Sequence, residues 1–147
     1  TAHASGGVEM LQAAGAGLAA GCGSREAGIL AVTVLTSIDD AAASALFGQT
    51  TGKLTSRLAR RAADAGVEGL VCSPKELGVV VEVAPGLLRV TPGIRPAGAA
   101  AHDQRRTATP AEAMARGADL LVVGRPITAA LDPVEAVARL HEELGAL

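Results

Sequence analysis

The sequence predicts an α/β fold built around a parallel β-sheet. Five short, nearly continuous apolar runs alternate with segments of helical pattern along the 147 residues. Strands that are apolar on both faces and alternate with helices are typical of a parallel sheet covered by helices. Polar residues, glycine or proline follow each apolar run at its carboxyl end. These observations indicate either an open doubly wound sheet or a (β/α) barrel.

The expected elements follow one another in a regular β-α order. Apolar runs, several of them enriched in β-branched residues, predict strands at residues 1–4, 29–35, 67–72, 87–91 and 119–123. Helical spacing of apolar residues, cap residues and first-turn prolines predict the helices. The expected helices cover residues 8–20, 41–47, 54–65, 75–83, a segment starting at 110, and 133–144.

The residues after the strands favour the barrel. No G-x-G-x-x-G pattern follows the first strand, which counts against a dinucleotide-binding doubly wound fold. In parallel barrels, the loops at the carboxyl ends of the strands build the active site. An eight-stranded barrel usually needs about 250 residues. We therefore expect the chain to supply about five of the eight β/α units of a (β/α)8 TIM barrel.

The composition argues against several classes of partner. The net charge is −2, the pI is about 5.9, and the chain has one Phe but no Trp or Tyr, so neither a basic stripe nor aromatic base-stacking platforms are expected. No stretch of about 18 apolar residues and no signal-peptide pattern occurs. Cys22 and Cys72 form no CxxC pair. These features predict a cytoplasmic protein without nucleic-acid, membrane or metal partners.

Gly124 and Arg125 directly follow the last predicted strand. A glycine at a strand end lets a ligand approach the backbone, and arginine can grip phosphate through two parallel hydrogen bonds. Barrels often bind phosphate after strands seven and eight, beside a short extra helix that residues 126–128 could start. The alternative is a surface arginine paired with a nearby acid. Arg95, in VTPGIRP, either binds the same anion or stabilises its own loop.

Other polar residues near strand ends each leave two interpretations. The amide of Gln104, in a long Gly-, Ala- and charge-rich loop, could close over a ligand. Thr36 either bonds the amide edge of a heterocycle or caps the helix that follows. Arg105 and Arg106 are interpreted as solvated, and His3 as a structural histidine rather than an acid-base group.

Six motifs give the chain a resemblance to a known family. They are HASGG (3–7), AVTVLTS (31–37), GLVCSP (69–74), VTPGIRP (90–96), DQRRTATPAEA (103–113) and DLLVVGRPIT (119–128). In this order and approximate spacing they resemble bacterial orotidine 5'-phosphate decarboxylases. The similarity covers the carboxyl-terminal part of that enzyme, from about the fourth strand of its barrel onward. Residues 1–147 are therefore expected to form the carboxyl-terminal portion of one TIM-barrel domain.

The resemblance implies a reaction and a set of contacts. The family consists of lyases that convert orotidine 5'-monophosphate to uridine 5'-monophosphate (UMP) and CO2 in pyrimidine biosynthesis. They need no metal or organic cofactor, and their catalytic array is completed across a homodimer. By motif, the phosphate contacts fall on Arg95, Gln104, Gly124 and Arg125. The pyrimidine contact falls on Thr36, and Pro92 packs near the base.

The resemblance does not extend to the catalytic residues. The family's alternating Lys/Asp array is centred on an Asp-x-Lys-x-x-Asp motif, which is absent from the 147 residues. No catalytic residue is therefore assigned in this chain, which by itself is expected to bind nucleotide without decarboxylating it. Two alternatives stay open: a non-catalytic half-barrel fragment that binds phosphate or nucleotide, and a related barrel enzyme that acts on a sugar phosphate.

Overall fold

The computed structural model describes residues 1–23, 26–96 and 106–145. One parallel sheet forms its centre, in the order β1-β2-β3-β4-β5. The strands are β1 (Ala2–His3), β2 (Leu30–Val32), β3 (Gly69–Val71), β4 (Leu88–Thr91) and β5 (Leu120–Leu121). Each strand pairs with the next one along the chain, so the strand order never reverses as it does in a doubly wound sheet. The topology is that of a barrel wall, as predicted.

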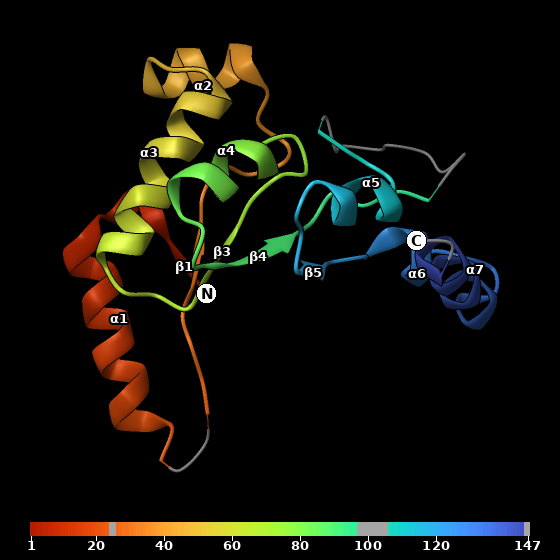
Figure 1. The fold of residues 1–147 in the computed structure, drawn as a ribbon, viewed down its shortest axis with the longest axis horizontal. Helices are drawn as coiled ribbons and strands as arrows, with labels where there is room; N and C mark the ends of the chain where they lie inside the picture. Colours follow the sequence, from red (N-terminus) through yellow and green to blue (C-terminus); the bar gives the residue numbers. More distant parts are fainter. Residues whose placement is uncertain (24–25, 97–105, 146–147) are drawn as a thin grey trace.

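Helices connect the strands in the predicted β-α order (Figure 1). They are the 3-10 helix η1 (Ala4–Gly6), α1 (Val8–Gly21), α2 (Asp40–Phe47), α3 (Thr51–Asp64), α4 (Leu77–Val83), α5 (Pro110–Ala115), α6 (Arg125–Thr128) and α7 (Pro133–Gly145). Each predicted helix therefore has a counterpart, and the differences lie at the boundaries.

Strand β2 is shorter than the apolar run that predicts it. The run covers residues 29–35, but ladder pairing ends at Val32. Beyond that point the carbonyl oxygens of Val34 and Leu35 accept hydrogen bonds from the side chain of Arg106 instead of from a neighbouring strand. The end of the run is therefore a loop held by a side chain that is distant in sequence.

Two helix starts illustrate what local sequence can and cannot predict. Thr109 and Glu112 form a reciprocal capping box at α5, with Pro110 at the first helical position, as the sequence predicts. Helix α3 starts at Thr51, earlier than the predicted residue 54. The carboxylate of Asp40 accepts the backbone N–H of Thr51 at 2.8 Å. Asp40 lies at the start of α2, so the pattern of residues around Thr51 does not predict this contact.

The two faces of the sheet differ in burial. Successive residues of a strand point to opposite faces. Ala31 and Leu70, which pair with each other, are fully buried in the core formed with α3 and α4. Leu88, Leu120 and Val122 point to the other face and are 48%, 55% and 49% exposed. Helices thus cover one face, and the open aliphatic face corresponds to the one that lines the interior of a closed barrel.

The carboxyl-terminal helices lie at the opposite end of the molecule from α1 (Figure 1). Helix α6 contacts α7, and α7 contacts α5. Leu140 is the buried residue of α7, whereas Val134 on the same helix is 80% exposed. The core is therefore thinner at this end than around α3 and α4.

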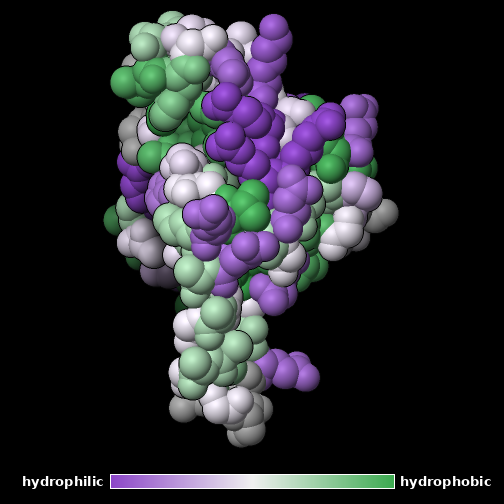
Figure 2. Space-filling model, turned by 90° about the vertical axis from the view of Figure 1, so that its left-hand side faces the viewer, coloured by the Kyte–Doolittle hydropathy of each residue, from purple (hydrophilic) through white to green (hydrophobic). Residues whose placement is uncertain are grey.

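Figure 2 shows the face of the molecule on which α1 and α3 lie. The tip of α1 projects away from the rest of the chain, and a hydrophilic band crosses the middle of this face. The exposed basic residues of α3 are Lys53, Arg57, Arg60 and Arg61. Within the described ranges, no helix combines the length and apolar content needed to cross a membrane.

Candidate functional site

The predicted contact residues that the structure describes lie at the carboxyl edge of the sheet. Thr91 of β4 pairs with Leu121 of β5. Arg95 lies four residues after Thr91, and Arg125 lies four residues after Leu121. The two arginines therefore extend from the same edge of neighbouring strands. Pro92, Gly124 and Thr36 follow strands at this edge as well.

Arg95 is buried beside a second arginine. The residue is 8% exposed, and its Nη1 donates to the carbonyl oxygen of Ile94 at 2.7 Å. Burial lowers the pKa of the Arg95 guanidinium, and the like charge of Arg125 lowers it further. Arginine nevertheless stays protonated in proteins. A phosphate dianion bound here would offset the repulsion between the two guanidinium groups.

Backbone hydrogen bonds fix the position of Arg95. Its N–H donates to the carbonyl oxygen of Ala108 at 2.9 Å, and the Ala108 N–H donates to the carbonyl oxygen of Gly93 at 3.4 Å. Gly93 has φ of 82°, a left-handed conformation that glycine adopts without a Cβ clash. The Pro92-Gly93 turn after β4 is therefore held against the chain that leads into α5.

Gly124 and Arg125 stand at the start of a short helix. The carbonyl oxygen of Gly124 accepts the N–H groups of Ile127 and Thr128 at 2.9 and 3.1 Å, and α6 follows. The predicted short helix after the last strand is confirmed. A Cβ added to Gly124 would meet no atom within 4 Å. Packing among the described residues therefore does not require glycine at this position.

Thr36 is buried at the end of the apolar run that contains β2. It does not cap the following helix, because Asp39 occupies that position and accepts the N–H of Ala42 at 2.9 Å. The helix-cap interpretation of Thr36 is therefore wrong. Gln104 lies outside the described residues, so its predicted phosphate contact stays a prediction.

His3 is exposed at the carboxyl end of β1. It lines a cavity of about 270 Å³ together with side chains from the loop after β2, from α2 and from α3, including Thr33, Phe47 and Arg57. This cavity lies beside the first two strands, and its lining residues include none of the predicted phosphate contacts.

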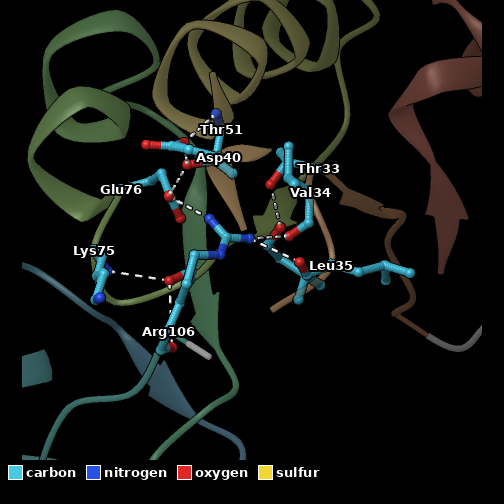
Figure 3. Close-up of polar contacts among 10 residues, drawn as sticks. Thr33, Val34, Leu35, Asp40, Thr51, Lys75, Glu76 and Arg106 are labelled. Atoms are coloured by element: carbon cyan, nitrogen blue, oxygen red, sulfur yellow. Dashed lines mark hydrogen bonds and ion pairs between the residues drawn. The ribbon is translucent and has the colours of Figure 1, made fainter. Parts of the chain in front are cut away.

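Arg106 is buried, and its interpretation as a solvated residue is wrong. It is 4% exposed. Its Nη1 pairs with the carboxylate of Glu76, and its Nη2 donates to the carbonyl oxygens of Val34 at 3.1 Å and Leu35 at 2.8 Å (Figure 3). A charge can be buried when a counter-charge and hydrogen-bond acceptors replace water. Glu76 supplies the counter-charge, and the loop at Val34 and Leu35 supplies the acceptors. Arg105 lies outside the described residues.

Glu76 joins this ion pair to the start of α3 (Figure 3). The hydroxyl of Thr51 lies 3.1 Å from Oε1 of Glu76 and 2.8 Å from Oδ1 of Asp40, and its single proton serves one of them at a time. Hydrogen bonds from the Thr51 backbone and side chain hold the pKa of Asp40 below its usual range. Glu76 and Arg106 are 30 residues apart, so no local motif marks the pair.

Cys72 lies in the core at the end of β3. Burial raises the pKa of its thiol to about 12, and the negative charge of Glu76 contributes in the same direction. The thiolate is the nucleophilic form of cysteine. Cys72 is therefore a neutral packing residue near neutral pH.

Consecutive parallel strands, helices over one sheet face and basic residues at the carboxyl edge define a protein of the (β/α)-barrel class. The chain belongs to the Orotidine 5'-phosphate decarboxylase / HUMPS family, whose model matches residues 1–140.

Curated relatives and a solved structure that resemble the chain carry the name of this family. The chain is 49% identical over 150 residues to orotidine 5'-phosphate decarboxylase of Paramagnetospirillum magneticum, covering 99% of this chain and 64% of the relative. It is 55% identical over 139 residues to the same enzyme of an Anaeromyxobacter species, covering 92% and 59%. The crystal structure of orotidine 5'-phosphate decarboxylase from Lactobacillus acidophilus is similar with a TM-score of 0.76 and 37% identity, covering 96% of this chain and 60% of that one.

In each of these matches, the chain covers only part of the relative. The chain spans about 60% of the length of the curated relatives and of the solved structure that it matches. The matches thus establish the family and the barrel topology.

Proposed function

We propose that the complete polypeptide carrying this chain decarboxylates orotidine 5'-monophosphate to UMP in pyrimidine biosynthesis. Residues 1–147 are proposed to form the carboxyl-terminal part of a single barrel domain and to supply the phosphate and pyrimidine contacts. The observation that carries the proposal is the family match over residues 1–140 in a chain that places Arg95 and Arg125 on neighbouring strand ends.

The phosphate contacts are assigned to Arg95, Gln104, Gly124 and Arg125. The proximity of Arg95 to Arg125 supports this assignment, because two neighbouring guanidinium groups can together donate charge-assisted hydrogen bonds to one phosphate dianion. Thr36 is assigned to the pyrimidine and Pro92 to a packing contact beside the base. Binding energy from the phosphate, remote from the reacting carbon, can hold the site closed and contribute to transition-state stabilisation.

The catalytic groups must come from outside these residues. The sequence holds no Asp-x-Lys-x-x-Asp motif, so the proposal requires a Lys/Asp array elsewhere in the complete polypeptide. In such an array the lysine protonates the carbanion-like carbon left by CO2, and the carboxylates act electrostatically. The open aliphatic face of the sheet, with Leu88, Leu120 and Val122, supports the presence of further barrel strands that would cover it.

We also propose a cytoplasmic homodimer, on the basis of the family resemblance. Leu46 and Phe47 of α2 are 68% and 45% exposed and provide apolar surface for a contact between subunits. The competing proposal is a half-barrel that binds nucleotide without chemistry, and the absent Lys/Asp motif is the observation that favours it.

The test is CO2 release from orotidine 5'-monophosphate by the complete polypeptide, together with thermal unfolding in UMP or ribose 5-phosphate. The proposal expects turnover and a larger stabilisation by UMP. UMP binding without turnover would support the non-catalytic half-barrel. A larger stabilisation by ribose 5-phosphate would instead indicate an enzyme that acts on sugar phosphates.

A further inference from the structure

We propose that Arg106 is a positioning residue that couples the phosphate-contacting part of the site to the pyrimidine-contacting part. This inference rests on the function proposed above, and it assigns a task to a buried ion pair that the substrate contacts do not include. Arg106 is not expected to touch substrate itself.

The side chain of Arg106 holds the loop that follows β2. Its Nη2 donates to the carbonyl oxygens of Val34 and Leu35, the two residues immediately before Thr36. Fixing two successive carbonyl groups fixes the peptide planes that lead into Thr36. The position of the pyrimidine contact therefore depends on where the guanidinium lies.

The backbone around Arg106 holds the other part of the site. Its carbonyl oxygen accepts the hydroxyl of Ser73, two residues after β3, at 3.5 Å. Two residues further on, the carbonyl oxygen of Ala108 accepts the N–H of Arg95. Arg106 thus stands on the segment that positions Arg95, and it comes two residues after Gln104 in the sequence. A shift of this segment would move phosphate and pyrimidine contacts together.

Glu76 fixes the guanidinium in this position. The side chains of Arg106 and Glu76 are 5% and 4% exposed, and the Glu76 carboxylate accepts from Arg106 and lies within hydrogen-bond distance of the Thr51 hydroxyl. A buried ion pair is a poor source of stability compared with well-packed apolar residues, but it can specify one arrangement of the chain. The planar guanidinium reaches a carboxylate and two carbonyl groups at once, which a lysine ammonium on its flexible stem does not reproduce.

The test compares UMP with uridine as ligands of the complete polypeptide. We measure dissociation constants by calorimetry for the unaltered protein, for Arg106→Lys and for Arg139→Lys, which alters an exposed i,i+4 pair with Glu135. Arg106→Lys is expected to weaken UMP binding at least about tenfold, because displacement of positioned groups by about 1 Å is costly. It is also expected to reduce the preference for UMP over uridine. Arg139→Lys should leave both constants within about twofold.

A double-mutant cycle separates coupling from loss of fold. If Arg106 positions Thr36, its effect on uridine affinity should shrink when Thr36→Val is already present, because coupled sites are not additive. Urea unfolding of each variant reports stability separately. If Arg106→Lys does not fold, Glu76→Gln, which keeps the shape and removes the counter-charge, is expected to lower the preference for UMP in the same direction.

The outcomes are distinct. Unchanged UMP and uridine affinities in folded Arg106→Lys or Glu76→Gln protein would overturn the positioning role and leave the proposed function intact. Failure of the unaltered complete polypeptide to bind UMP would overturn both. A lower UMP preference combined with non-additivity at Thr36 would support the coupling.

Discussion

Arg95 and Arg106 lie on either side of residues 97–105, and the protein surrounds them differently. Both are buried, with exposures of 8% and 4%. Arg106 faces a carboxylate and two carbonyl groups, and the surroundings of Arg95 include the carbonyl oxygen of Ile94 and the guanidinium of Arg125. Burial alone therefore does not define the role of an arginine here. The groups around it do: Arg106 lies between a carboxylate and two carbonyl groups of other segments, and Arg95 lies near a second arginine at the strand-end edge where an anionic ligand is proposed to bind.

The largest expected effect is on stability at Glu76. Glu76→Ala leaves the Arg106 charge buried without its carboxylate, which should lower the free energy of unfolding by about 3–5 kcal/mol. The matched control is Glu135→Ala, which breaks an exposed pair with Arg139 and should cost less than about 1 kcal/mol. Urea denaturation at neutral pH measures both. Equal losses for the two variants would mean that the Arg106 side chain is solvated in solution.

The second prediction concerns ligand affinity at Arg125. Arg125→Ala should weaken UMP binding by about 10- to 100-fold, the range expected for loss of a charge-assisted hydrogen bond worth roughly 1.5–3 kcal/mol. Uridine, which lacks the phosphate, should bind within about twofold of the unaltered protein. Because Arg125 is exposed, its removal should change the unfolding free energy by less than about 0.5 kcal/mol. A parallel loss of uridine binding would contradict a phosphate-specific role.

The smallest expected effect is on stability, at the ion pair between Arg89 and Asp119, which lies outside the strand-end site. Hydrogen bonds from Arg89, with a side-chain contact of 2.7 Å, hold the pKa of Asp119 below the ordinary aspartate value. The ionised Asp119 carboxylate therefore stabilises the folded state above about pH 3.9, and this stabilisation is lost as the pH falls through the lower folded-state pKa. Asp119→Asn should lower the free energy of unfolding by less than about 1 kcal/mol at pH 7. Urea denaturation should show a smaller difference between the variant and the unaltered protein at pH 3. A difference that grows on acidification would contradict this sign.

Local sequence predicts most of the fold because its determinants are local. The capping box of Thr109 and Glu112 and the short helix after Gly124 follow from nearby residues. The element boundaries for which the prediction is wrong, the end of β2 and the start of α3, depend on contacts between residues distant in sequence. The loop at Val34 and Leu35 is set by Arg106, some 70 residues away in the chain.

The sequence predicts only part of the candidate site, because some of its contacts join segments that are distant in the chain. Strand-end residues such as Arg95 and Arg125 reach one edge of the sheet because parallel strands direct them there. Arg106 follows another arginine in a charge-rich segment, a pattern typical of solvated loops. Its burial becomes visible only when Glu76 and the loop after β2 are placed beside it in three dimensions.

The most direct measurement is a crystal structure of the complete polypeptide with UMP bound. We predict that the phosphate lies between the guanidinium groups of Arg95 and Arg125, that the pyrimidine lies beside Thr36, and that Arg106 stays paired with Glu76 without contact to the ligand. A phosphate bound by Arg106, or a nucleotide seated away from the carboxyl ends of β4 and β5, would contradict this prediction.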